Sequence, residues 1–294
     1  MSSKKSLVIN VGKYRMHIDP MKRGISSSLW GQGYREPCFM WILEKEAKGK
    51  LGIDLGANLG YATLYMCENL DKVVAIEPDK RMRKLLKRNI KENGIKEKVE
   101  VENFAISNKD SKEIIYLSKK HPNINTLCEN KKLIKSKDLL EKKVITVRKI
   151  DSLQLLPDFI KMDIEGYEVE AISGAMNTLK SVKNCKLLIE VHPQYYDEKR
   201  NFARILEELF KIGFNVKYVV SAANECPTLF KDRGYSPFKV FKDEKRKRGI
   251  FKGVSKEDVI DFCAFRHKES DYDKISIKIA RSILLIKSDK RETY

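Results

Sequence analysis

The chain has 294 residues, of which 34% are charged, and its net charge is +18. This length supports one large core, so a single domain with appendages fits better than two equal domains. Six widely spaced cysteines without a C-x-x-C pair argue against zinc or redox chemistry, and no stretch reaches the ~18 apolar residues of a membrane span. We therefore expect a cytoplasmic protein. The positive charge favours anionic partners or serves solubility alone.

The segment ahead of the main fold is short. Residues 6–18 are typical of two strands around Gly12, and residues 36–48 of a helix. The expected organisation is an extension at 1–48, a main domain at 49–268 with an insert at about 107–150, and a tail at 269–294.

From residue 51 onward the pattern alternates strands with helices. The expected strands are 51–55, 72–77, 99–105, 158–164, 186–192, 214–220 and 258–266, with helices at 59–69, 80–93, 168–179 and 199–212. The insert adds strands at 113–117 and 144–150. This order predicts an α/β fold, a doubly wound and mostly parallel seven-stranded sheet, whose ligands collect at the carboxyl ends of the strands.

The first expected strand enters a glycine loop, Gly56-Ala57-Asn58-Leu59-Gly60. Glycine lacks a Cβ, so the backbone can turn sharply and a ligand can lie against it. Glu77 ends the next strand, 21 residues after Gly56, which is about the spacing at which an acid binds a ribose. The combination predicts a site for an adenosine ligand.

The loop also limits which adenosine ligand it can take. Asn58 stands where the dinucleotide fingerprint has its second glycine, so a pyrophosphate is disfavoured. Asp54, two residues before Gly56, would repel a phosphate but could bind an ammonium group directly or through water. S-adenosylmethionine has that ammonium group and no phosphate, and we expect it as the cofactor.

Several ordered motifs between residues 7 and 195 resemble those of the FkbM-type S-adenosylmethionine-dependent methyltransferases. They are Gly33-Tyr34-Arg35-Glu36-Pro37, Ile53-Asp54-Leu55-Gly56-Ala57-Asn58-Leu59-Gly60-Tyr61, Ala75-Ile76-Glu77-Pro78, Asn103-Phe104-Ala105-Ile106-Ser107, Ile160-Lys161-Met162-Asp163-Ile164-Glu165-Gly166-Tyr167-Glu168 and Leu188-Ile189-Glu190-Val191-His192-Pro193. The I-K-x-D-x-E-G-x-E segment is the most specific of them.

The resemblance implies a class I, Rossmann-like methyltransferase that methylates a hydroxyl group of a carbohydrate, glycan or glycolipid. It places Asp54, Gly56, Asn58 and Gly60 at the methionine end of the cofactor, Glu77 at the ribose, and Asn103 and Ala105 at the adenine. The Asn/Asp-Pro-Pro-aromatic motif of many base-amine methyltransferases is absent after Met162. An RNA methyltransferase and a cofactor-binding scaffold without catalysis remain as alternatives.

The candidate catalytic groups follow two strands expected to be neighbours. Side chains alternate along a strand, so Lys161, Asp163 and Glu165 share one side, and Glu190 and His192 share one side of the next strand. His192 is the natural general base because its unperturbed pKa is near 6.5. Asp163 or Glu190 would orient it or act as the base instead.

Other roles for these groups stay open. Asp163, Glu165, Glu190 and His192 could hold Mg²⁺ or Mn²⁺, which would lower the pKa of a bound hydroxyl. In a purely structural interpretation, Glu165 caps the next helix and Lys161 neutralises Asp163.

Three further residues are candidate substrate contacts: Glu36, Asn123 and Asn125. Residues 275–287, ISIKIARSILLIK, are typical of a basic amphipathic helix. That helix would lie on an anionic membrane, peripheral to it, or pack on the sheet or on another subunit.

Overall fold

The computed structural model describes residues 6–21, 24–118, 121–128, 140–222, 224–243, 246–263 and 280–288. Within these ranges no helix combines the length and the apolar character that a membrane crossing requires. Nor does any disulfide join the six cysteines, all of which lie in the described ranges.

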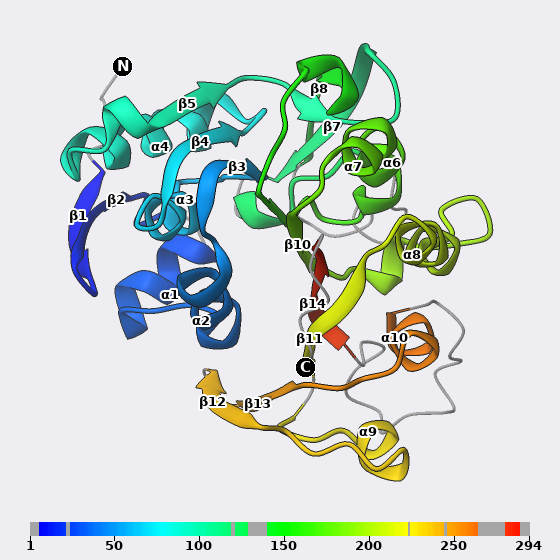
Figure 1. The fold of residues 1–294 in the computed structure, drawn as a ribbon. Helices are drawn as coiled ribbons and strands as arrows, with labels where there is room; N and C mark the ends of the chain where they lie inside the picture. The colour runs from blue at the N-terminus through cyan, green and yellow to red at the C-terminus, as the bar shows by residue number, and fades with distance from the viewer. Residues whose placement is uncertain are drawn as a thin grey trace.

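The centre of the fold is a nine-stranded mixed sheet in the order β12-β13-β11-β14-β10-β9-β3-β4-β5 (Figure 1). Its strands are β3 (Gly49–Leu55), β4 (Leu70–Ile76), β5 (Val99–Glu102), β9 (Phe159–Met162), β10 (Cys185–Glu190), β11 (Asn215–Ser221), β12 (Lys239–Asp243), β13 (Arg246–Phe251) and β14 (Ala280–Lys287). The five strands from β5 to β10 in this order are mutually parallel, whereas β14 runs antiparallel to both of its neighbours. The sheet is thus largely parallel as expected, but mixed and two strands wider.

Helices cover both faces of the sheet (Figure 1). One face carries α1 (Ile25–Gln32), α2 (Pro37–Glu46), α3 (Tyr61–Met66) and α4 (Lys80–Glu92), and the other carries α6 (Glu168–Ser173), α7 (Met176–Ser181), α8 (Phe202–Lys211) and α10 (Lys256–Cys263), with α9 (Thr228–Asp232) near the β12–β13 hairpin. Two large apolar clusters fill these layers. Short 3-10 turns lie at Lys96–Lys98, Pro122–Ile124, Asp151–Leu153 and Pro193–Tyr195.

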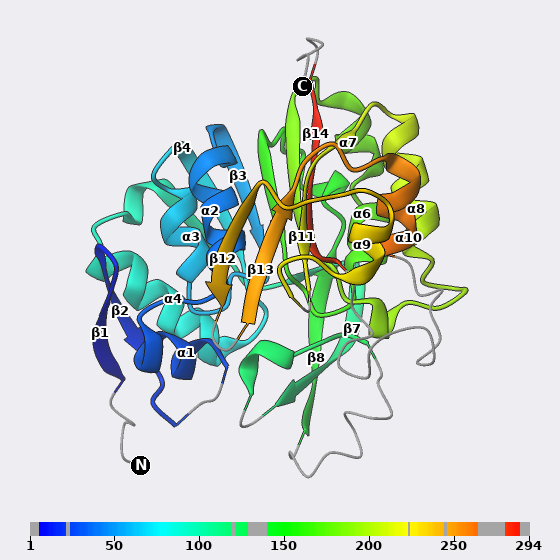
Figure 2. The ribbon, with the colours of Figure 1, turned by 90° about the horizontal axis from the view of Figure 1, so that it is seen from below.

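Two small sheets complete the fold. The hairpin β1 (Leu7–Val11) and β2 (Tyr14–Ile18) packs against α4, and β6 (Ala105–Ile106), β7 (Ser111–Ser118) and β8 (Leu140–Arg148) form a three-stranded sheet. In Figure 2 the arrow of β12, which has the direction of the parallel strands, points toward the edge where β7, β8 and α1 lie. The N-terminal extension and the insert therefore border the carboxyl ends of the parallel strands.

The C-terminal part differs most from expectation. Residues 256–263 form α10, which takes up residues 258–263 of the expected last strand. Ser255 accepts the backbone N–H of Asp258, and buried Val259, Phe262 and Cys263 follow a helical period. The described part of the expected amphipathic helix, Ala280–Lys287, is strand β14. Its apolar side chains are buried on both faces between β10 and β11, so they are not available to a membrane.

Two smaller differences concern element breaks. The strand expected at 99–105 stops at Glu102, and Ala105–Ile106 pairs with β8 in the small sheet. The helix expected at 168–179 divides at Gly174, where a Cβ would lie 2.0 Å from the carbonyl oxygen of Ser107. The backbone approaches its neighbour too closely there for any residue but glycine.

Candidate active site

One cavity opens where β3, β4, β9 and β10 end. The cavity and the solvent space at its mouth together span about 1090 Å³. The expected site residues that line it are Glu36, Gly56, Asn58, Glu77, Ala105, Asn125, Lys161, Asp163, Glu165 and Glu190. Those that do not line it are Asp54, Gly60, Asn103 and His192.

The glycine loop forms one wall of the cavity. Gly56 has a φ of +73°, and a Cβ there would lie 2.1 Å from the carbonyl oxygen of Asp163. Gly60 has a φ of +91°, and its Cβ would lie 2.6 Å from Leu86 Cδ1 on α4. These glycines allow the loop to pack on neighbouring segments of the chain. The sequence pattern had predicted instead that they make room for a ligand.

Glu77 is held at the end of β4 by the loop itself. Its Oε2 accepts the backbone N–H of Asn58 at 2.8 Å, and its Oε1 accepts that of Asp79 at 2.7 Å. Burial raises the pKa of Glu77 to about 7, although the two backbone donors oppose the shift. Each carboxylate oxygen has two lone pairs, so a ribose diol can still donate to it. This geometry fits the ribose of an adenosine cofactor.

Asp54 contacts Lys161 and lies away from the cavity. It is fully buried, its Oδ1 lies 2.9 Å from the ammonium of Lys161, and its Oδ2 accepts from the Thr63 hydroxyl at 2.6 Å. The same ammonium donates to the carbonyl oxygens of Leu55 and Gly56. Asp54 and Lys161 therefore brace the glycine loop, and Lys161 pairs with Asp54 rather than with Asp163.

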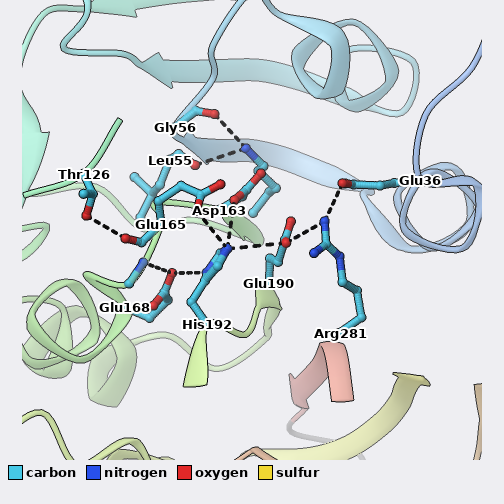
Figure 3. Close-up of polar contacts among 12 residues, drawn as sticks. Glu36, Leu55, Gly56, Thr126, Asp163, Glu165, Glu168, Glu190, His192 and Arg281 are labelled. Carbon is cyan, nitrogen blue, oxygen red and sulfur yellow. Dashed lines mark hydrogen bonds and ion pairs between the residues drawn. The ribbon is translucent and has the colours of Figure 1, made fainter. Parts of the chain in front are cut away.

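His192 lies at the centre of four carboxylates (Figure 3). Its Nε2 is 3.4 Å from Glu190, 3.5 Å from Glu165 and 3.9 Å from Asp163. Its Nδ1 lies 2.9 Å from Glu168. The imidazole is only 1% exposed, so it lies behind the carboxylates and not in the cavity. His192 thus contacts the carboxylates rather than the open space of the cavity.

Glu168 fixes this imidazole from behind. It accepts hydrogen bonds from the backbone N–H of Gly166 and from the Tyr196 hydroxyl, at 3.1 and 3.0 Å. Glu168 is not among the candidate catalytic residues expected from the sequence. Its place in the I-K-x-D-x-E-G-x-E segment is the signal that could have revealed it.

A second ion-pair chain crosses the opposite wall. Arg281 of β14 contacts Glu36 at 2.6 Å and Glu190 at 2.7 Å (Figure 3). Arg35 contacts Glu36 at 3.0 Å. Burial acts to raise the pKa of Glu36, but the two guanidinium groups outweigh it and lower this pKa. Glu36 is thus an ionised wall residue. Sequence reasoning missed Arg281, because it lies 245 residues from Glu36 in a segment expected to be a helical tail.

The carboxyl group of Asp163 has an unusual affinity for protons. Burial raises its pKa to about 8, with further increases from Glu190 and Glu165, while Lys161 and His192 oppose the shift. A group with a pKa near the working pH can take up a proton and release it again, as a general base must. Asp163 lines the cavity, unlike His192.

The remaining candidates are Asn125, Asn103, Ala105 and Asn123. The side chain of Asn125 accepts the backbone N–H of Ser118 and donates to Asp79, and it lines the cavity. Asn103 is exposed outside the cavity, whereas Ala105 borders it. The side chain of Asn123 lies outside the described part of the structure.

Three of the four candidate metal ligands meet in space. Single ligand atoms of Asp163, Glu165 and His192 lie within 4.8 Å of one another, and Glu168 on the far nitrogen of the imidazole is a common outer partner in metal sites. Glu190 is instead paired with Arg281. The group could accept a divalent cation through two carboxylates and one imidazole.

The fold is Rossmann-like, and its cavity joins the glycine loop to an acidic cluster. The protein family described as "methyltransferase FkbM domain" matches residues 54–216, which are more than half of the chain. The chain therefore belongs to the FkbM methyltransferase family, whose members depend on S-adenosylmethionine. No curated protein matches it.

Several solved structures are similar to this chain. Methyltransferase FkbM from Methylobacillus flagellatus KT is 19% identical with a TM-score of 0.40, over 70% of this chain and 44% of that protein. The M. jannaschii tRNA m1G37 methyltransferase is 13% identical with a TM-score of 0.41, over 99% and 56%. M. jannaschii TYW2 in complex with AdoMet is 14% identical with a TM-score of 0.40, over 86% and 89%. The chain thus spans less than half of the Methylobacillus protein.

Proposed function

We propose that this protein transfers a methyl group from S-adenosylmethionine to a hydroxyl group of a carbohydrate, glycan or glycolipid. The observation that carries the proposal is the position of Asp163. It lines the same cavity as Glu77, is packed against the glycine loop at Gly56, and has a raised pKa. A base at that position would stand beside the reactive end of a cofactor whose ribose is held by Glu77.

The chain has to supply position and proton removal. When bound, the cofactor contributes an electrophilic methyl group, and the acceptor oxygen must be aligned with it. A neutral hydroxyl is a poor nucleophile, so a positioned base contributes about 10² to 10⁴ in rate. Asp163 would take the hydroxyl proton at its carboxylate, while His192 and Glu190 keep that carboxylate oriented from behind.

The acceptor end of the cavity favours a polyol. Carboxylates of Asp163, Glu165 and Glu190 and the amide of Asn125 line it, and all of them can bind sugar hydroxyls. The same carboxylates would repel the phosphates of RNA at this point. RNA nevertheless stays the second candidate acceptor because of the net charge of +18. A glycolipid acceptor would place the protein at the membrane surface.

A metal-assisted reaction is the alternative mechanism. Arg281 already places a cation 2.7 Å from Glu190, and Lys161 lies against the loop, which disfavours a further dication beside them. We therefore favour the base mechanism. Transfer that survives EDTA supports it, whereas transfer lost in EDTA and restored by Mg²⁺ or Mn²⁺ would favour the metal site.

The test is a transfer assay with methyl-labelled S-adenosylmethionine and separated polysaccharide, lipid and RNA fractions of the host. Asp163→Asn is compared with Asp71→Asn, which changes an exposed aspartate on β4. We expect label in a glycan or glycolipid fraction with the wild type and the Asp71 variant only. Label in nuclease-sensitive material would replace the glycan with RNA. Cofactor binding without transfer to any fraction would favour the non-catalytic scaffold.

A further inference from the structure

The positive charges in the cavity wall are few. Of the described residues that line it, only Lys161 and Arg35 are cationic. The Lys161 ammonium already contacts the Asp54 carboxylate and two backbone carbonyl oxygens, so its three N–H donors have partners within the protein. A carboxylate entering this cavity would therefore have one cation left to meet, which is Arg35.

Arg35 is well placed for such a ligand. It lines the cavity together with Asn58 of the glycine loop and with Tyr61 and Ala62 in the first turn of α3. Its described contacts are an ion pair of 3.0 Å to Glu36 and a long contact of 3.5 Å to the Ser28 hydroxyl. A guanidinium group has five N–H donors in a planar fork that matches a carboxylate. Donors therefore remain for a ligand in the cavity.

The proposed cofactor carries one carboxylate. Glu77 and Ala105, the residues expected at the ribose and the adenine, line the cavity, and Asn58 and Tyr61 lie along the loop and helix that follow β3. We propose that Arg35 binds the carboxylate of the methionine part of S-adenosylmethionine. This inference rests on the proposed use of the cavity as the cofactor site, and it adds a cofactor contact that lies outside the strand ends.

The position of Arg35 also gives the N-terminal extension a function. Arg35 and Glu36 immediately precede α2, and Glu36 continues through Arg281 to Glu190 at the acidic cluster. A carboxylate bound at Arg35 would compete with Glu36 for the guanidinium group and weaken the Arg35–Glu36 ion pair. Cofactor binding is thereby connected to the wall that supports Glu190.

Two ligands separate this role from a structural one. S-adenosylhomocysteine has the amino acid part, whereas 5′-deoxy-5′-methylthioadenosine has the same adenosine and a thioether sulfur but no carboxylate. Affinities for both are measured by titration calorimetry for the wild type, Arg35→Met, Arg35→Lys and Arg204→Met. The last variant changes an arginine on α8 that is 77% exposed, and it serves as the matched control.

We expect Arg35→Met to weaken S-adenosylhomocysteine binding about 10- to 100-fold, the range for a lost charged hydrogen bond, and to leave methylthioadenosine within about twofold. Arg35→Lys should lose less, because it keeps the charge. Unchanged S-adenosylhomocysteine affinity in Arg35→Met would overturn the inference, even if this variant lost methyl transfer. An equal loss for both ligands would also overturn it and indicate a structural role. Failure of the wild type to bind either ligand would instead reject the proposed cofactor site itself.

Discussion

Asp163 joins three parts of the site. Its carbonyl oxygen touches the position of Gly56, its side chain lines the cavity, and its carboxylate faces His192. Burial beside Glu190 and Glu165 disfavours the ionised form of the Asp163 carboxylate, so its position there has a cost in stability. Such a cost is typical of positions that serve chemistry at the expense of stability.

The raised pKa of Asp163 predicts a stability change with a definite sign. The pKa of about 8 in the fold lies above the ordinary value of about 4, so the folded state binds more protons between these values. Stability contributed by this group therefore falls as the pH rises from about 4 to about 8. Asp163→Asn should melt about 3 °C or more above the wild type at pH 8, with a smaller difference at pH 5. A melting series settles this, and a lower melting temperature for the variant at pH 8 would refute it.

Glu77 predicts how cofactor binding depends on pH. The ribose donates to the ionised carboxylate, and the pKa of this group is about 7. Binding should therefore release a proton below pH 7, and affinity for S-adenosylhomocysteine should fall about tenfold from pH 8 to pH 6. Calorimetry in two buffers of different ionisation enthalpy counts the protons. Glu77→Gln should bind weakly at both values; an equal pH dependence in this variant would exclude Glu77 as the cause.

At the residue scale, the sequence predicted which side chains gather at the acidic cluster more accurately than it predicted the contacts of each one. The alternation rule placed Asp163, Glu165, Glu190 and His192 together, and the structure does the same. Asp54 was expected to face the cofactor but is turned into the protein by Lys161. A lysine on the adjacent strand decides this, and its pairing depends on strand register that a sequence pattern does not contain.

Among the elements, the loop after β3 has its closest backbone approach at Gly56. Gly56→Ala would bring a Cβ to 2.1 Å from a backbone oxygen, whereas at Gly94, whose φ of +67° is similar, nothing lies within 4 Å. Gly94→Ala should cost about 1 kcal/mol for its backbone strain alone. Gly56→Ala should cost about 3 kcal/mol or more and abolish binding of S-adenosylhomocysteine. Denaturant unfolding compares the two, and similar losses would show that the close approach has no consequence.

Most core elements were predictable, since strands β3, β4, β9, β10 and β11 and helices α4 and α8 follow clear apolar patterns. The failures occur where a short apolar run fits two periods. Residues 280–287 resemble an amphipathic helix in isolation, but the gap between β10 and β11 makes them a strand buried on both faces. Tertiary context decided the outcome there.

For the whole molecule, β14 connects the two halves of the main sheet. It lies between β10 and β11, and it also carries Arg281, which pairs with Glu190 of the cavity wall. A chain ending at residue 288 should fold with the wild-type melting temperature, whereas one ending at 279 should fail to fold. Circular dichroism and gel filtration distinguish them. A folded chain of 279 residues that only loses membrane association would restore the anchor hypothesis.

The central claim is that Asp163 acts as the base beside a cofactor held by Glu77. The most direct measurement compares label transfer by the wild type and Asp163→Asn into the accepting host fraction, with S-adenosylhomocysteine affinity measured on the same preparations. We expect affinities within about threefold and transfer reduced at least about 100-fold in the variant. Transfer that persists in the variant with the cofactor bound would contradict the account.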